Sequence, residues 1–195
     1  RATVRLCDHE KEWEVEAINT ISRLKRILGS AIKDIQHIGS TSILSIKAKP
    51  IIDIVVAVEH FDDILVLEKE LKAAGFYYRP NAGLENQLLF ACGSYYDGSG
   101  DLQTHFIHVV KTNSMDWINY INFRVYLNKT PQAAKAYEDL KVSLSQAVPI
   151  DSGREKYRKG KHDFIVYTLR KALVNSYLGK MITIKVDRPI GSVHP

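Results

Sequence analysis

One apolar segment constrains this chain more than any other: residues 51–58, which read Ile-Ile-Asp-Ile-Val-Val-Ala-Val. Its β-branched residues predict a buried strand over residues 50–58. A buried strand seldom keeps a lone carboxylate, because removing an ionised group from water without a partner is costly. We therefore expect Asp53 to point into a functional site. The alternative is a structural ion pair with Lys47 or Lys49, which are near in sequence.

A short polar turn, Gly-Ser-Thr-Ser at residues 39–42, precedes this strand. Backbone N–H groups and hydroxyls at such a turn suit a phosphate or carboxylate group. Side chains of this kind also often bond only to local backbone, so a purely structural turn is the alternative. The residues expected to bind a ligand here are His37, Gly39, Ser40, Thr41, Ser42 and Lys49.

The rest of the chain divides into a mixed first half and a helical second half. Spacings of three to four between apolar residues predict helices at 13–28, 62–74, 114–128, 131–147 and 154–178. Strand-like runs are found at 34–38, 76–79, 87–92 and 103–110. We expect an α+β fold, in which residues 1–112 form a mixed sheet flanked by helices, 113–178 form a helical layer that closes a cleft, and 179–195 form a tail.

Two histidines lie in the last predicted strand, within His105-Phe106-Ile107-His108. Side chains alternate across a strand, so His105 and His108 should lie on opposite faces unless the strand is bulged or one residue lies at its end. The pair alone is a weak metal signal. A core histidine with satisfied hydrogen bonds is the more common state for a His among apolar neighbours.

These segments together resemble the GrpB family (UPF0157-type), an uncharacterised family with a nucleotidyltransferase-like fold. The resemblance rests on His-Ile-Gly-Ser-Thr-Ser at 37–42, Lys-Pro-Ile-Ile-Asp at 49–53 and the histidine pair, and it extends over about residues 4–172. It implies a nucleotidyltransferase-like mixed sheet flanked by helices, followed by a C-terminal helical layer.

Tyrosines and basic residues recur on the predicted helices of the second half. A spacing of four residues puts Tyr137 with Lys141, and Tyr157 with Lys161, on single helix faces. With Arg158 they would form a phosphate- and base-binding wall that faces the strand carboxylate. In the alternative, the tyrosines pack between helices and the charges are solvated. The resemblance favours the wall, because the family's helical half has similar residues.

The wider nucleotidyltransferase pattern has two carboxylates one residue apart on a strand, which hold divalent metal at a triphosphate. Here Asp53 is the catalytic candidate, but Ile54 and Val55 follow it, so the second carboxylate is missing. Asp53, His105 and His108 would form the metal set. Such oxygen and nitrogen ligands suit Mn²⁺ or Zn²⁺ better than Mg²⁺, although Mg²⁺ fits if phosphates supply further oxygens.

Two classes of function remain open. One is metal-dependent transfer of a nucleotidyl or related phosphoryl group, with a nucleotide or other phosphorylated small molecule as ligand. The other is a non-catalytic binding domain or protein partner. The resemblance supports this second class too, because GrpB proteins occur fused to dephospho-CoA kinase, a coenzyme A biosynthesis kinase.

Composition adds weaker constraints. With 27 basic and 22 acidic residues, a net charge of +5 and no long basic run, anionic ligands are mildly favoured and nucleic acid is not expected as a partner. The two cysteines, Cys7 and Cys92, fit a reducing compartment, so we expect a cytoplasmic protein without a membrane segment. The tail, with a predicted strand at 182–186, resembles the start of a bacterial inorganic-pyrophosphatase-like domain; an ordinary C-terminal strand is the alternative.

Overall fold

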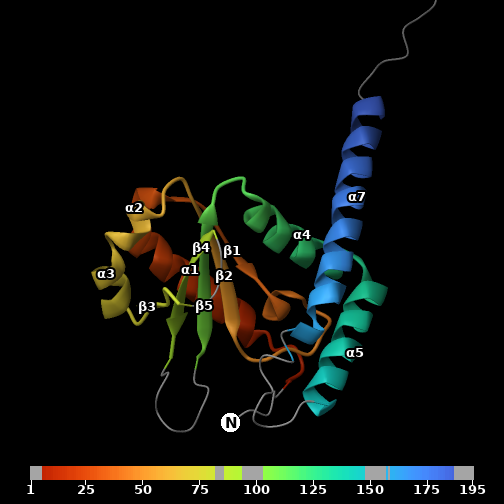
Figure 1. The fold of residues 1–195 in the computed structure, drawn as a ribbon, viewed down its shortest axis with the longest axis horizontal. Coiled ribbons are helices and arrows are strands. Elements are labelled where there is room, and N and C mark those ends of the chain that lie inside the picture. Colours follow the sequence, from red (N-terminus) through yellow and green to blue (C-terminus); the bar gives the residue numbers. More distant parts are fainter. Residues whose placement is uncertain (1–5, 82–85, 94–102, 148–156, 158, 187–195) are drawn as a thin grey trace, which may run out of the picture.

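A mixed sheet forms the centre of the molecule in the computed structural model, which describes residues 6–81, 86–93, 103–147, 157 and 159–186, and only the backbone of 147 and 176–186 (Figure 1). The strands lie in the order β1-β2-β5-β4-β3. β2 and β5 are parallel, and the other neighbours are antiparallel. The strands are β1 Ile32–Ile38, β2 Ile52–Val58, β3 Tyr77–Tyr78, β4 Gln87–Cys92 and β5 His105–Lys111.

Three helices, α1 Glu12–Leu28, α2 Asp62–Leu65 and α3 Glu68–Ala73, pack on one face of this sheet. The apolar stripe of α1 places it there, because residues three to four apart share one side of a helix. Gly29 ends α1 with φ of +53°, a conformation that glycine adopts easily. The core on this face contains Trp13, Ala17, Leu24 and Leu28 of α1 and the alternate β2 residues Ile52, Ile54, Val56 and Val58.

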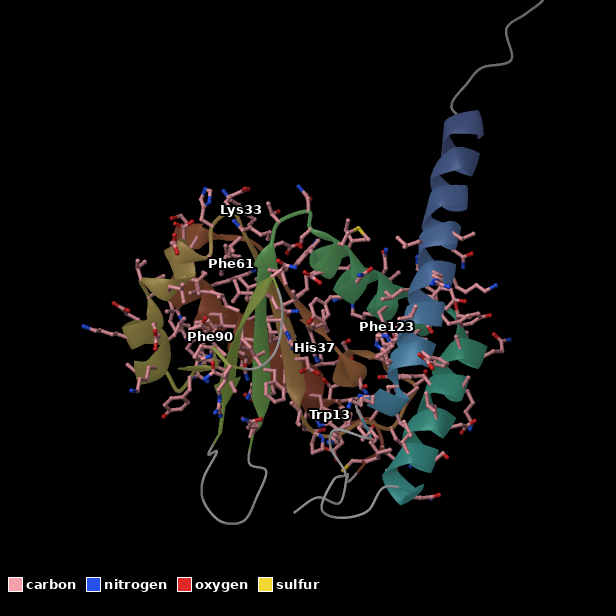
Figure 2. The ribbon with its side chains drawn as sticks, viewed as in Figure 1. Trp13, Lys33, His37, Phe61, Phe90 and Phe123 are labelled. Atoms are coloured by element: carbon pink, nitrogen blue, oxygen red, sulfur yellow. The ribbon has the colours of Figure 1, made fainter. Side chains whose placement is uncertain are left out.

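The other face is covered by α4, Met115–Lys129, whose Trp117, Tyr120 and Ile121 pack on the sheet. The sheet residues beneath them are Ile38, Val55 and Val110. Beside α4 lie α5, Pro131–Ala147, and α7, His162–Val186, which continues beyond the body of the molecule (Figure 1). These helices and the 3₁₀ turn η2, Ser40–Ser42, enclose a further core that contains Ile43, Ile46, Leu127, Ala134 and Tyr137, with Phe123 (labelled in Figure 2) and Phe164 packed against it.

The predicted α+β class is confirmed: a mixed sheet flanked by helices is followed by a helical layer. One helix prediction differs, since residues 62–74 form α2 and α3 instead of a single helix. The break lies at Val66 and Leu67, where the Leu67 N–H bonds to the Ile64 carbonyl at 3.0 Å. This i→i−3 hydrogen bond is of the tighter 3₁₀ type, and the α-helical hydrogen-bond pattern is interrupted there.

The end of the chain corrects a second prediction. The strand expected at 182–186 is wrong, because α7 continues to Val186 and passes through the expected boundary at 178. A glycine inside a helix costs only about 1 kcal/mol, so Gly179 does not end it. Residues 154–156, 158 and 187–195 lie outside the described residues. No described helix combines the length and apolar character needed to cross a membrane.

Candidate functional site

Asp53 lies near the start of β2, on the face that α4 covers, with Ile38 and Phe106 as its neighbours on β1 and β5. The turn after β1 packs directly on it. A Cβ added to Gly39 would lie 2.3 Å from Asp53 Oδ2, and Gly39 has φ of +71°. Both the contact and the backbone conformation therefore require glycine at this position.

The Asp53 carboxyl is difficult to ionise. Burial raises its pKa to about 7, and the Lys161 ammonium opposes this shift. The side chain is nevertheless 27% exposed, so a ligand can reach it. Lys47, one partner proposed for a structural ion pair, bonds to Asp8 instead. A carboxylate with this environment is suited to binding a cation or to exchanging a proton near neutral pH.

His108 lies on the same face as Asp53, with its Nε2 3.9 Å from Asp53 Oδ1. Its Nδ1 is 3.1 Å from Gln87 Oε1 and 3.0 Å from the Tyr120 hydroxyl. Burial lowers the pKa of His108 to about 4, so the ring is neutral at pH 7. Burial also raises the pKa of Tyr120, which remains protonated.

His105 lies on the opposite face, as strand alternation predicts. Its Nε2 is 3.1 Å from both Thr20 Oγ1 and Glu16 Oε1 on α1, and its Nδ1 is 2.8 Å from Thr104 Oγ1. Burial lowers its pKa, while Glu16 opposes that shift. The structure thus joins His108 to Asp53 and leaves His105 out. Within the described ranges, no three His, Cys, Asp or Glu side chains gather to hold a metal by themselves.

The hydroxyls of the Gly-Ser turn are largely used within the protein. Thr41 donates to the Ile51 carbonyl at 3.2 Å and lies 2.9 Å from His37 Nε2, while Ser42 donates to the Gly39 carbonyl at 2.7 Å. These bonds match the structural alternative for both residues.

His37, labelled in Figure 2, lies on the opposite face of the sheet from Asp53. It pairs with Ile54 across β1 and β2 and therefore lies on the face that α1 covers. Burial, with the nearby Arg124 and His9, lowers the pKa of His37 to about 4. Unlike Thr41 and Ser42, Ser40 hydrogen-bonds through its side chain to Tyr137 on the helical half.

Two lysines near the Asp53 carboxylate contact the same aromatic ring. Lys49 Nζ lies 5.1 Å and Lys161 Nζ 4.6 Å from the centre of the Tyr157 ring. Burial and Lys49 lower the pKa of Lys161, to about 8, while Asp53 opposes that change. A carboxylate from the sheet and an ammonium from the helical half therefore interact across the site. Arg158 lies outside the described residues.

Tyr137 and Lys141, expected to form part of a binding wall, are buried instead of exposed to a ligand. The Tyr137 ring stacks on Phe164 with centres 5.2 Å apart, and burial raises its pKa to about 12. Lys141, 1% exposed, donates to the Lys47 carbonyl and lies 4.8 Å from the Tyr137 ring centre. Burial lowers its pKa to about 7. Both residues hold α5 to the loop that precedes β2.

Sequence reasoning missed the polar stripe of α4 and its partner Gln87. Tyr120, Arg124 and Asn128 are four residues apart on α4 and all reach the sheet or the turn. Arg124 donates to the His37 carbonyl at 2.6 Å, and Asn128 donates to the Ser42 carbonyl at 2.9 Å. Polar residues at this spacing inside an apolar helical pattern were the available signal.

Comparison with known proteins places these features in a wider group. A family model described as GrpB protein matches residues 3–171. The glutamate-rich protein GrpB of Alkalihalophilus pseudofirmus is 37% identical over 166 residues, covering 85% of this chain and 93% of that protein. The crystal structure of conserved protein GrpB from Enterococcus faecalis superposes with a TM-score of 0.77 at 30% identity, covering 89% of this chain and 99% of that one.

Some relatives are longer than the matched region. The UPF0157 protein YqkA of Bacillus subtilis is 32% identical over 162 residues, which are 83% of this chain but only 45% of that protein. The family match ends before the tail of the present chain. The expected likeness of that tail to an inorganic-pyrophosphatase-like domain finds no support in these comparisons.

Proposed function

The chain belongs to the GrpB family, and we propose that it binds the phosphate groups of a nucleotide or related phosphorylated small molecule beside Asp53. The observation that carries this proposal is the interaction of Asp53 with Lys161, which lies with Lys49 over one Tyr157 ring. Lys49 lowers the pKa of Lys161, and an anion bound between the two ammonium groups would relieve that repulsion. A phosphorylated ligand would therefore contact both Lys49 and Lys161. A cation would be needed to offset the charge of the Asp53 carboxylate beside it.

Asp53 Oδ1 and His108 Nε2 would be the protein's ligands for a divalent metal ion. Their separation of 3.9 Å exceeds a hydrogen bond and is slightly wider than the roughly 3–3.5 Å between two atoms that share one ion. Carboxylate and imidazole suit Mn²⁺ or Zn²⁺, and Mg²⁺ fits when phosphate oxygens complete the set. Bound there, the ion would neutralise phosphate charge and lower the pKa of an attacking hydroxyl.

As an enzyme, the protein would transfer a nucleotidyl or phosphoryl group from a nucleoside triphosphate to an acceptor hydroxyl, with pyrophosphate or the nucleoside diphosphate as the leaving group. Lys49 and Lys161 would hold the phosphates, with Ser40 at the edge of the same site. Asp53 would take part by holding the metal ion, which would lower the pKa of the acceptor hydroxyl so that its proton passes to solvent. Tyr137 and Lys141 would not contact the ligand; they would fix the loop between η2 and β2.

A second candidate is a binding or partner domain without transfer chemistry. Val55 favours it, because this residue shares the face of Asp53 and is fully buried against Ile38 and Val110. The position at which nucleotidyltransferases have a second carboxylate is therefore part of the apolar core. Such a domain would sense a nucleotide or serve another enzyme, for example a coenzyme A biosynthesis kinase.

Binding and transfer can be tested separately. Calorimetric titration with ATP, CTP, GTP and coenzyme A precursors, with Mn²⁺, Zn²⁺ or Mg²⁺ present, should show binding by the wild type. Lys161→Met should weaken it by about tenfold or more. Lys171→Met is the matched control, because Lys171 also lies over a tyrosine, 5.5 Å from the Tyr167 ring centre, but on the exposed surface of α7.

Isotope-labelled nucleotides then distinguish the two candidates. Transfer of label to an acceptor supports the enzyme, and binding without transfer supports the binding domain. If the wild type binds none of these phosphorylated compounds, the proposal is wrong and a protein partner is favoured.

A further inference from the structure

The side chains of His108, Gln87 and Tyr120 form a closed triangle on the face of the sheet that α4 covers. Its sides are 3.1 Å between His108 Nδ1 and Gln87 Oε1, 3.0 Å between His108 Nδ1 and the Tyr120 hydroxyl, and 3.0 Å between that hydroxyl and Gln87 Oε1. The three residues come from β5, β4 and α4, so the triangle exists only in the folded protein.

Counting protons in this triangle selects one form of the neutral imidazole. Gln87 Oε1 can only accept, and it has two lone pairs. The Tyr120 hydroxyl donates to it. An Nδ1 proton on His108 would fill its second lone pair, whereas an unprotonated Nδ1 would place two acceptors 3.1 Å apart. The geometry therefore favours the tautomer that is protonated at Nδ1.

This tautomer leaves a lone pair on Nε2, the ring nitrogen 3.9 Å from Asp53 Oδ1. We propose that Gln87 and Tyr120 are positioning residues, which hold His108 as the Nδ1–H tautomer so that Nε2 can bind a cation shared with Asp53. The cation part of this inference rests on the proposed function; the tautomer part does not. Residues that bond the far nitrogen of a ligating histidine commonly set its orientation and basicity.

Nitrogen-15 NMR of the histidine rings in the metal-free protein, near neutral pH, tests the tautomer directly. The wild type should show His108 protonated at Nδ1. Gln87→Leu should shift His108 toward the Nε2–H form, while Gln87→Glu, which keeps an acceptor, should keep Nδ1 protonated. Tyr120→Phe should perturb the ring shifts. Tyr126→Phe, on the same helix but packed in the other core, should leave them unchanged.

Zn²⁺ titration of the same proteins by calorimetry supplies the second readout. Gln87→Leu should weaken Zn²⁺ binding about tenfold or more, and Gln87→Glu should restore it. An Nε2–H tautomer in the wild type, or an unchanged tautomer in Gln87→Leu, would overturn the assignment. If the tautomers behave as expected but no variant binds Zn²⁺, the positioning of His108 is supported and the metal reading of the site is wrong.

Discussion

Gly39 and Asp53 occupy adjoining space so closely that a Cβ on Gly39 would lie 2.3 Å from Asp53 Oδ2 and 2.9 Å from Asp53 Cβ. The turn backbone forms one wall of the carboxylate's environment. It excludes water on that side and contributes to the burial that raises the pKa of Asp53 to about 7. The chemical state of the carboxyl is thus tied to the absence of a side chain at Gly39.

The first prediction is that Gly39→Ala destabilises the protein by roughly 3 kcal/mol or more, because the clash adds to the strain of a positive φ. Gly29→Ala is the matched control. Gly29 has φ of +53° but nothing within 4 Å of an added Cβ, so it should lose only about 1–2 kcal/mol. Urea unfolding measures both changes.

Equal losses at Gly39 and Gly29 would contradict the contact. A double-mutant cycle with Asp53→Gly, which removes the clashing atoms, should recover part of the Gly39→Ala loss.

The second prediction concerns Asp53→Asn. The folded pKa of about 7 lies above the ordinary value of 3.8, so the folded wild type binds more protons between these values and loses stability as the pH rises through that window. Asn has no such proton to lose. The variant should match the wild type near about pH 4 and exceed its stability by ~1–2 kcal/mol near about pH 8.

Thermal or urea unfolding across this pH range measures the difference. A variant that is less stable at every pH would behave as if a structural ion pair had been broken.

The third prediction is that the Thr41 hydroxyl has a structural role. Thr41→Val leaves the Ile51 carbonyl and His37 Nε2 without a hydroxyl partner, and should cost ~1–2 kcal/mol while phosphate affinity persists. Ser22→Ala is the control, since Ser22 bonds the Ile18 carbonyl on the exposed side of α1 and should change little. A large loss of phosphate affinity with unchanged stability in Thr41→Val would return Thr41 to the binding site.

The fourth prediction concerns the buried Lys141. Its folded pKa of about 7 lies below the ordinary value of 10.5, so the folded state binds fewer protons between these values and stability rises with pH across that window. The stability of the wild type relative to Lys141→Met should therefore increase from about pH 7 to about pH 9, by on the order of 1 kcal/mol.

Unfolding curves at several pH values give this difference. Lys135→Met is the control: the hydrogen bond to Asp139 raises the pKa of the exposed Lys135, which therefore stays charged from about pH 7 to about pH 9, and this variant should show no such increase. A pH-independent difference for Lys141→Met would show that the ammonium is charged throughout.

Local sequence signals were sufficient to place the helix starts at which a capping or helix-starting residue is present. Ser114 begins the helix predicted at 114–128 as its N-cap, since serine favours this position, and its Oγ accepts from the Trp117 N–H at 3.3 Å. Pro131 begins α5 as expected, because proline fits the first turn of a helix. The prediction for the segment after Gly179 was wrong because it relied on a local pattern whose outcome depends on tertiary contacts. Its alternating pattern suits a strand, yet strand preference is realised only beside a sheet edge, and the helical hydrogen bonds of α7 continue through it.

The sequence by itself determined that Asp53 lies on a buried strand behind a glycine turn, and that His105 and His108 face opposite ways, because side-chain alternation is a local property of the backbone. Only the tertiary structure decided which histidine joins Asp53. α1 packs over His105 and supplies Glu16, whereas α4 packs over His108. The pairing of Lys161 with the carboxylate was decided in the same way. Which helix covers which face depends on burying apolar surface between segments far apart in the chain, and no local pattern encodes that choice.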